Sequence, residues 1–210
     1  MNLMLDTMAV SATLLGSAMA FPQARRLFRT RRVEGVSAAW IGVSVALNAW
    51  WLAYGLWVGV YALVPVSAIS VLMYLSIGVL FVRTTGRRSL RGIIASAAAL
   101  GAVPLPFLLA GGWAAAGVVA GLCYGLQLLP AVVAAYRSDE LAGIAAGTWI
   151  IALVESALWL VYGLGVGDVA LIAGGASGLP MSGLIVARLA IVRERAVESE
   201  QSVIRLAIAR

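Results

Sequence analysis

The sequence predicts an all-α membrane protein with seven transmembrane helices, arranged as two parallel three-helix repeats joined by one linker helix (3+1+3). Composition is the first observation behind this fold class. The chain of 210 residues is 62% hydrophobic and only 11% charged, with a mean hydropathy of +1.00, whereas a soluble globular domain is nearer ~45–50% apolar and ~25% charged. Long uncharged stretches are the second observation. Residues 35–82 and 92–136 carry no charge, and each stretch is more than twice the ~20 residues that one helix needs to cross a bilayer.

An internal repeat is the third observation. A shift of 108 positions places Phe21–Arg83 over Leu129–Ile191 without a gap, and it superimposes Trp51–Gly59 on Trp159–Gly167. A two-fold repeat in a very apolar chain is typical of transporters whose two halves rock about a central site.

The arginines indicate how the spans are oriented. Seven spans are expected, at about 7–27, 36–56, 61–82, 90–110, 113–136, 142–164 and 168–190. Arginines lie in the loops after the first, third and fifth spans and in the tail, while the opposite side carries only Asp6 and Asp168. The positive-inside rule therefore predicts an external N-terminus and a cytoplasmic C-terminus. The exclusive use of arginine among basic residues, the short loops and the absence of organelle signals favour a bacterial cell membrane.

The predicted orientation also explains the fourth span. A three-helix unit that starts outside ends inside, so a second copy in the same orientation requires one extra crossing. We therefore expect a first repeat at 1–83, a linker helix at 84–112, a second repeat at 113–192 and a cytoplasmic tail at 193–210. Pro104 and Pro106 predict that the linker is a kinked, peripheral helix. The tail is expected to be loosely ordered, with a short surface helix as the alternative.

Several classes of function are disfavoured by the residues that are missing. With no histidine, one cysteine and one carboxylate well inside a span, the sequence offers no nucleophile–base pair and no metal site. We therefore predict no enzyme, no catalytic residues and no cofactor. The net charge of +6 does not indicate nucleic-acid binding, because the arginines cluster at the ends of apolar spans, as topology signals do.

Glu155 is the only charged residue that lies well inside a predicted span. A carboxyl group within the membrane by default marks a substrate pathway or a proton site. Glu155, Trp159 and Tyr162 are spaced i, i+4 and i+7, so they share one helical face. The alternative is a structural carboxyl group that is hydrogen-bonded to another helix.

Prolines and glycines indicate where helices bend and approach one another. Pro22 and Pro130 occupy the same repeat position near the inner ends of spans one and five, where a kink could act as a hinge or be static. Small residues spaced by four let helices pack closely, and such glycines occur in span five (Gly117, Gly121, Gly125) and span seven (Gly174, Gly178).

A family resemblance adds to these inferences. The triplet Phe21-Pro22-Gln23, followed by basic residues, is a PQ-loop signature. Together with Leu47-Asn48 before Trp51 and Tyr54-Gly55, and with Trp159 before Tyr162-Gly163, it resembles the SWEET/PQ-loop (MtN3-saliva) family of membrane transporters in its full-length, seven-helix form. The resemblance covers essentially the whole chain.

The resemblance implies a binding pocket midway across the membrane, between the two repeats. Trp51 and Trp159 would stack on a sugar ring there, although tryptophans in spans also serve packing or interfacial belts. The family places an asparagine on spans three and seven, where this chain has Ser67 and Gly175. Asn48 is the strongest polar group left in the first half. The gating or hinge residues would be Pro22, Gln23 and Pro130.

Three functions remain open at this stage. The first is facilitative uniport of a small polar solute, with a mono- or disaccharide favoured, by alternating access. The second is transport of an amino acid or another charged metabolite, proton-linked or cationic, with Glu155 as the site. The third is a non-transporting membrane receptor of the same fold. The expected partners are the lipid bilayer and the solute. A monomer could suffice because both halves are in one chain, and a homo-oligomer stays open as well.

Overall fold

The computed structural model of the chain describes residues 3–19, 29, 37–137 and 146–208, and all regular structure in these residues is helical. The helices are α1 (Leu3–Met19), α3 (Ala38–Val58), α4 (Leu63–Thr85), α5 (Arg88–Ala102), α6 (Leu105–Arg137), α7 (Ala146–Val166) and α8 (Val169–Ile208). The all-α fold class predicted from the sequence is confirmed.

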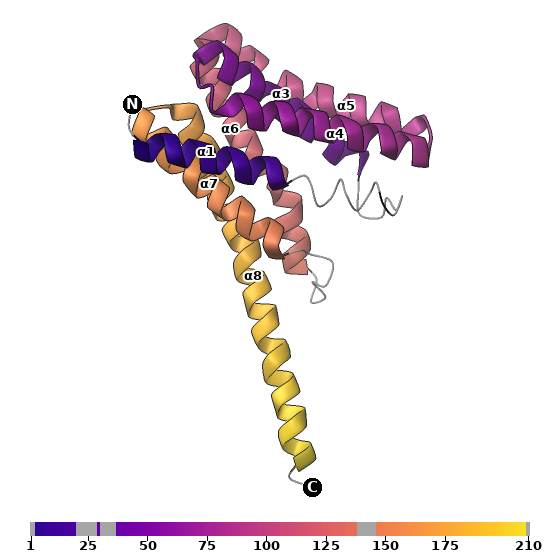
Figure 1. Ribbon diagram of the computed structural model, residues 1–210. Coiled ribbons are helices and arrows are strands. Elements are labelled where there is room, and N and C mark those ends of the chain that lie inside the picture. Colours follow the sequence, from indigo (N-terminus) through magenta and orange to yellow (C-terminus); the bar gives the residue numbers. More distant parts are fainter. Residues whose placement is uncertain (1–2, 20–28, 30–36, 138–145, 209–210) are drawn as a thin grey trace.

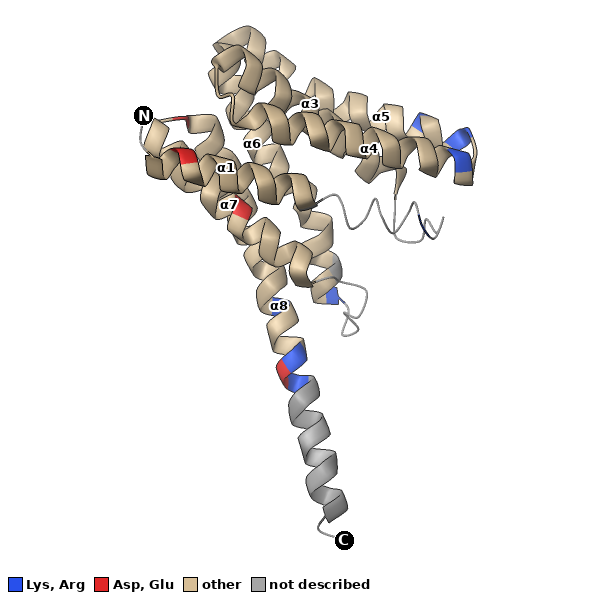
Figure 2. Cartoon of the chain, in the orientation of Figure 1, with Lys and Arg blue, Asp and Glu red and all other residues tan. Residues whose placement is uncertain are grey.

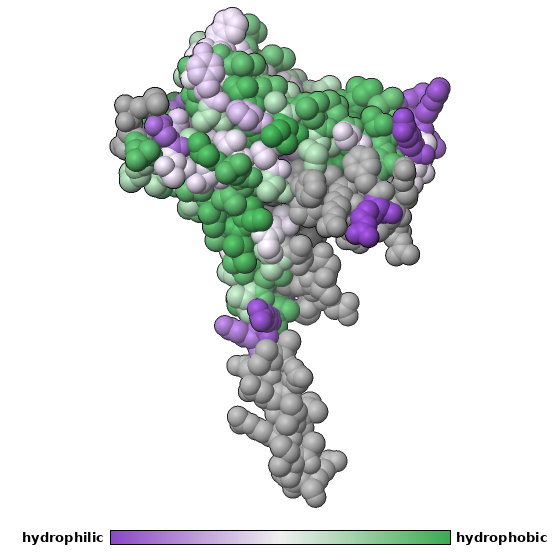
Figure 3. All heavy atoms as spheres, in the orientation of Figure 1, coloured by the Kyte–Doolittle hydropathy of each residue, from purple (hydrophilic) through white to green (hydrophobic). Residues whose placement is uncertain are grey.

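Five of these helices are long and apolar enough to cross a membrane: α3, α4, α6, α7 and the Val169–Arg195 part of α8. The α1 helix contributes a shorter apolar segment, Leu3–Ala18. Apolar side chains dominate the visible surface between the charged ends of the molecule (Figure 3). The chain is therefore a multi-pass membrane protein, as its composition predicts.

Equivalent glycines shape two tight turns of the chain. Gly59 ends α3 and Gly167 follows α7, and both adopt positive φ angles of 85° and 72°, which glycine adopts without steric cost. One turn earlier, Gly55 and Gly163 let the next helix approach closely. A Cβ atom at Gly55 would lie 3.0 Å from Leu63 Cβ, and one at Gly163 would lie 2.8 Å from Leu171 Cβ. The 108-residue repeat thus corresponds to repeated local geometry.

The linker departs from the single kinked helix expected at 90–110. The α5 helix ends at Ala102, and the chain re-enters a helix at Leu105. Pro104 causes this break, because it has no N–H to donate back into α5, and its side chain is fully buried. The Trp50 indole of α3 donates to the Gly101 carbonyl oxygen at 3.0 Å, which satisfies an acceptor next to the break. A second break lies inside α6 at Gly112, with φ 68° and ψ −163°, between the predicted fourth and fifth spans.

The prediction of a loosely ordered tail is wrong. The α8 helix continues through the 193–208 segment to Ile208 (Figure 1). Extending an existing helix avoids the cost of nucleating a new one. The segment contains no glycine or proline and several arginines and glutamates, which favour helix.

Two helices, α4 and α8, each pack against two others. The α4 helix contacts both α1 and α3, and α8 contacts both α6 and α7. The α5 helix packs on α3. The largest buried cluster joins Tyr54 and Leu63 of the first repeat to Trp159 and Leu171 of the second. The core therefore lies where the two repeats meet.

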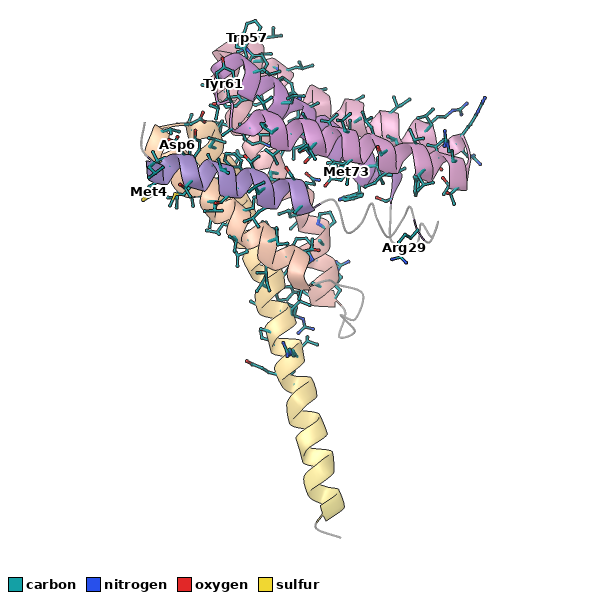
Figure 4. The ribbon with its side chains drawn as sticks, viewed as in Figure 1. Met4, Asp6, Arg29, Trp57, Tyr61 and Met73 are labelled. Atoms are coloured by element: carbon teal, nitrogen blue, oxygen red, sulfur yellow. The ribbon has the colours of Figure 1, made fainter. Side chains whose placement is uncertain are left out.

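Charged side chains separate towards opposite ends of the helices. Arginines gather at the α4–α5 turn, at the end of α6 and on α8 just before its grey part, where one acidic residue lies among them, while an acidic residue lies near the N-terminal end of α1 and another on α7 (Figure 2). Asp6, Trp57 and Tyr61 lie on one side of the molecule and Arg29 on the opposite side (Figure 4). This segregation has the pattern on which the predicted orientation depends, and the orientation itself stays a prediction.

Candidate functional site

A hydrogen bond between Tyr54 and Asp168 joins the two repeats at the end of the molecule away from the arginines. The buried Tyr54 of α3 donates its hydroxyl to Asp168, with both carboxylate oxygens 2.9 Å away. Asp168 is held in place because its Oδ1 also accepts the backbone N–H groups of Ala170 at 2.9 Å and Leu171 at 3.0 Å. The carboxylate therefore caps the N-terminus of α8 and ties α3 to it.

The two tryptophans predicted to line a pocket lie next to this bond, in one cluster. The Trp51 ring meets the Tyr54 ring edge-on, with centroids 5.8 Å apart. It also lies over α8 of the other repeat, since a Cβ atom at Gly174 would be 3.2 Å from Trp51 Cζ2. Trp159 is 9% exposed and meets Tyr162 edge-on at 5.9 Å. Trp51 of α3 and Trp159 of α7 thus belong to the same cluster as Tyr54.

Glu155 points from α7 towards α1. Its Oε1 accepts the indole N–H of Trp159 at 3.3 Å, which confirms that these residues share one helical face. Its Oε2 is buried and has no hydrogen-bond partner in the described part of the chain. A Cβ atom at Gly16 of α1 would overlap Oε1 and would lie 2.8 Å from Val66 of α4. The carboxyl group therefore occupies the space that the absent Gly16 side chain leaves.

A layer of polar side chains between the repeats was not predicted from the sequence. Gln127 of α6 donates from Nε2 to the hydroxyl of the fully buried Ser44 on α3 at 2.8 Å. The Tyr74 hydroxyl of α4 interacts with the same serine, and Tyr124 of α6 lies beside Ser156 of α7. Tyr124 and Ser156 both lie over Gly178 of α8. Hydroxyl and amide groups from α3, α4, α6 and α7 therefore make up this layer.

The other predicted binding residues occupy different surroundings. Asn48 donates from Nδ2 to the Ser44 carbonyl oxygen of its own helix at 2.8 Å. Ser67 is buried on α4. Gly175 lies at the contact between α7 and α8, because a Cβ atom there would be 2.6 Å from the Leu160 nitrogen. Its neighbour Gly174 is the residue that lies under Trp51.

The predicted hinge residues are only partly described. Pro130 is inside α6 with an exposed side chain. Pro22 and Gln23 lie outside the described residues. In the described part of the chain, no group of three histidine, cysteine or acidic side chains could hold a metal ion.

Comparison with known proteins supports the fold. No family model matches the sequence, and a search for similar curated proteins found none. Among solved structures, the chain is similar to a eukaryotic SWEET transporter with a TM-score of 0.68 and 18% sequence identity, over 91% of this chain and 99% of the other. The chain therefore has a SWEET-like fold over nearly its whole length, and the resemblance inferred from its motifs is confirmed at the level of the fold.

Proposed function

We propose that the protein is a transporter that carries a small polar solute, in the first place a mono- or disaccharide, by facilitative alternating access. Residues 1–83 and 113–192 would form the two halves, joined by residues 84–112, with the solute pocket between them. The protein would lie in the cell membrane with its N-terminus outside and its C-terminus in the cytoplasm. The SWEET-like fold and the segregated charges support this arrangement.

The observation that carries the proposal is the hydrogen bond between Tyr54 and Asp168, which crosses the two repeats beside both tryptophans. A single charge-assisted bond at a seam can break and re-form without unfolding either half. We therefore assign it the role of an outer gate, closed in this conformation. The predicted hinge residues Pro22, Gln23 and Pro130 would let the inner side of the carrier close when this gate opens.

The residues beside the gate suit a sugar. Aromatic rings offer apolar faces to the C–H surface of a sugar ring, and Trp51 and Trp159 supply one from each repeat. Ser44, Asn48 and Gln127 supply hydroxyl and amide groups that can exchange their present hydrogen bonds for bonds to solute hydroxyls.

Uptake into proteoliposomes tests this function. Radiolabelled glucose and sucrose would be offered with and without a pH gradient, to the wild type and to a Trp51→Ala/Trp159→Ala double variant. Trp57→Ala is the matched control, because Trp57 lies on the same helix with 73% of its surface exposed. Gradient-independent sugar entry that the double variant loses and the control keeps would support a sugar uniporter with this pocket. Absence of any sugar entry would refute it.

One observation favours a second candidate, a proton-linked or cationic metabolite carrier. The buried Oε2 of Glu155 lacks a hydrogen-bond donor among the described residues, and an ionised carboxylate without a partner is costly inside a membrane. A proton or a cationic solute would neutralise it. Uptake of arginine, lysine or cystine that is driven by a pH gradient and lost in Glu155→Gln would support this candidate. Absence of flux for every solute would instead favour a receptor of the same fold.

A further inference from the structure

The helices group in space differently from the repeats. The α1 helix, the first of the first repeat, packs more extensively along α7 of the second repeat than on α4 of its own (Figure 1). The strongest remaining contacts join α6 and α7 to α8, and α4 and α5 to α3. Four helices, α1, α6, α7 and α8, therefore form one group, and α3, α4 and α5 form the other.

Residues at equivalent repeat positions explain why α1 stands away from α4. In the second repeat α6 reaches the α8 backbone, because a Cβ atom at Gly121 would lie 2.6 Å from Gly174 N and 2.9 Å from Ala170 O. The same shift of 108 places Thr13 at the position of Gly121 and Ala62 at that of Ala170. There the Thr13 side chain stands between the helices and donates to the Ala62 carbonyl oxygen at 2.8 Å.

A second pair of substitutions explains why α1 approaches α7. In the second repeat the ring of Tyr124 fills the space over Gly178, where a Cβ atom would overlap it. The repeat counterpart of Tyr124 is Gly16, which leaves that space empty on α1. The Glu155 carboxyl group of α7 fills it instead.

The two equivalent seams between the repeats therefore differ in chemistry. Glu155 has Leu47 as its counterpart, and Leu47 packs on Ala120 and Cys123 of α6. Among the described residues, the α3–α6 seam thus consists of apolar contacts and one hydrogen bond, from Gln127 to Ser44. The α1–α7 seam contains a carboxyl group enclosed against a helix backbone.

We propose that Gly16 is a positioning residue for Glu155, and that through this pair α1 moves with α6, α7 and α8 during transport, against a unit of α3, α4 and α5. The inference rests on the proposed function, because only a carrier needs two units that move. The boundary between the moving units then lies inside the first repeat. The bonds that break at the outer end are those that cross this boundary, from Tyr54 to Asp168 and from Thr13 to Ala62.

Two thiol tethers test this boundary in a Cys123→Ala background. The first joins α1 to α7 through Leu5→Cys and Gly165→Cys, whose positions are in contact. The second joins α1 to α4 through Thr13→Cys and Ala62→Cys. With a short reducible crosslinker, we expect the α1–α7 tether to keep solute flux within about twofold and the α1–α4 tether to lower it about tenfold or more, because domain motion gates transport. Recovery after reduction shows that the variants are folded. Any other pattern of the two tethers overturns the inference.

Distance measurements separate failure of this inference from failure of the proposed function. Spin labels at the exposed Val10 of α1, Val161 of α7 and Ile69 of α4 would be compared in lipid nanodiscs, which requires no known solute. We expect a narrow α1–α7 distribution and a broad or two-peaked α1–α4 distribution. The shared motion is contradicted if the α1–α7 distance distribution is as broad as the α1–α4 one. It is also contradicted if both distance distributions are narrow, even when solute flux is observed. Absence of flux with the expected distances instead contradicts only the transport proposal.

The Gly16–Glu155 contact itself is tested by rescue. Gly16→Ala places a methyl group where the carboxyl oxygen lies, so we expect flux to fall about tenfold, as overpacking of a close contact does. Glu155→Asp shortens the side chain by one methylene and Val66→Ala removes the methyl group that lies 2.8 Å from the added Cβ atom, so adding both to Gly16→Ala should restore most of the flux, whereas Val66→Ala alone should not. Gly183→Ala is the control, because its Cβ atom would meet only Leu153 Cδ1 at 3.6 Å. A harmless Gly16→Ala, no rescue by the two changes together, or rescue by Val66→Ala alone refutes the positioning role.

Discussion

Removal of the Tyr54 hydroxyl is the most direct test of the outer gate. In Tyr54→Phe the ring keeps its contacts with Trp51, while the bond to Asp168, 2.9 Å from each carboxylate oxygen, is lost. A hydrogen bond to a charged group contributes ~1.5–3 kcal/mol. Asp168 keeps its two backbone donors, so α8 remains capped. The lost hydrogen-bond energy therefore destabilises only the closed state of the gate. Because 1.4 kcal/mol is a factor of ten in an equilibrium constant, the closed-to-open ratio should fall about 10- to 100-fold.

The native Cys123 reports this change without engineering. It is the only cysteine of the chain and is 4% exposed, packed with Leu47 at the α3–α6 seam. The rate at which a membrane-impermeant maleimide labels Cys123 from the outside should rise with the open population. Tyr162→Phe is the matched control, because it removes a hydroxyl at the equivalent repeat position that has no hydrogen bond within the described residues. Equal labelling of wild type, Tyr54→Phe and Tyr162→Phe would refute the gate.

Three further predictions concern other contacts of the structure. Trp50→Phe removes the donor to Gly101 O at the break between α5 and α6, so thermal stability in detergent should fall by about 1 kcal/mol, the typical worth of such a bond. Gly121→Ala places a methyl group 2.6 Å from Gly174 N, and the separation of α6 and α8 should cost ~1–3 kcal/mol, measured by the same melting assay. Glu155→Gln leaves the size of the side chain unchanged but removes its charge, so any dependence of flux on a pH gradient should disappear.

Each of these predictions has a variant that should behave differently. Trp57→Phe changes an exposed tryptophan of the same helix that stacks on Trp113, with ring centroids 5.7 Å apart; phenylalanine can keep this stacking, so the melting temperature should fall less than in Trp50→Phe. Gly147→Ala adds a methyl group with nothing within 4 Å and should be neutral or slightly stabilising, because alanine favours helix over glycine. For Glu155→Gln, an unaltered pH dependence of transport would show that this carboxyl group carries no coupling proton.

The features predictable from the sequence are those that depend on local pattern. The 108-residue shift pairs Gly59 with Gly167, and both adopt positive φ angles in the turn after a helix. The same short motif ends a helix in the same way in both copies. The spacing of Glu155 and Trp159 predicts one face, and the structure has their side chains hydrogen-bonded. The sequence predicts only a kink at Pro104 and Pro106, because it does not reveal that Trp50 satisfies the Gly101 carbonyl next to the break.

Contacts between distant segments could not be predicted in this way. Tyr54 and Asp168 are 114 residues apart, and they are not equivalent in the repeat, so symmetry gives no reason to pair them. Gly175 aligned with a binding position of the resembled family, yet its rotation about α8 directs it to Leu160, while Gly174 meets Trp51. Neighbouring residues on a helix point about 100° apart. A sequence alignment alone therefore does not tell which of the two glycines faces Trp51.

The divergence between the repeats bears on which solute the protein takes. Where both copies kept their residues, as at Trp51 and Trp159, the surfaces on offer are aromatic and neutral. Where the copies differ, as at Gly16 against Tyr124 and Leu47 against Glu155, the α1–α7 seam contains a carboxyl group and the α3–α6 seam contains an apolar side chain. A neutral sugar would use Trp51 and Trp159 and leave Glu155 as a structural group of α7 packed against α1, whereas a cation would use Glu155 itself. Because the two roles require different residues, the Trp51→Ala/Trp159→Ala and Glu155→Gln variants separate them even before the solute is known by name.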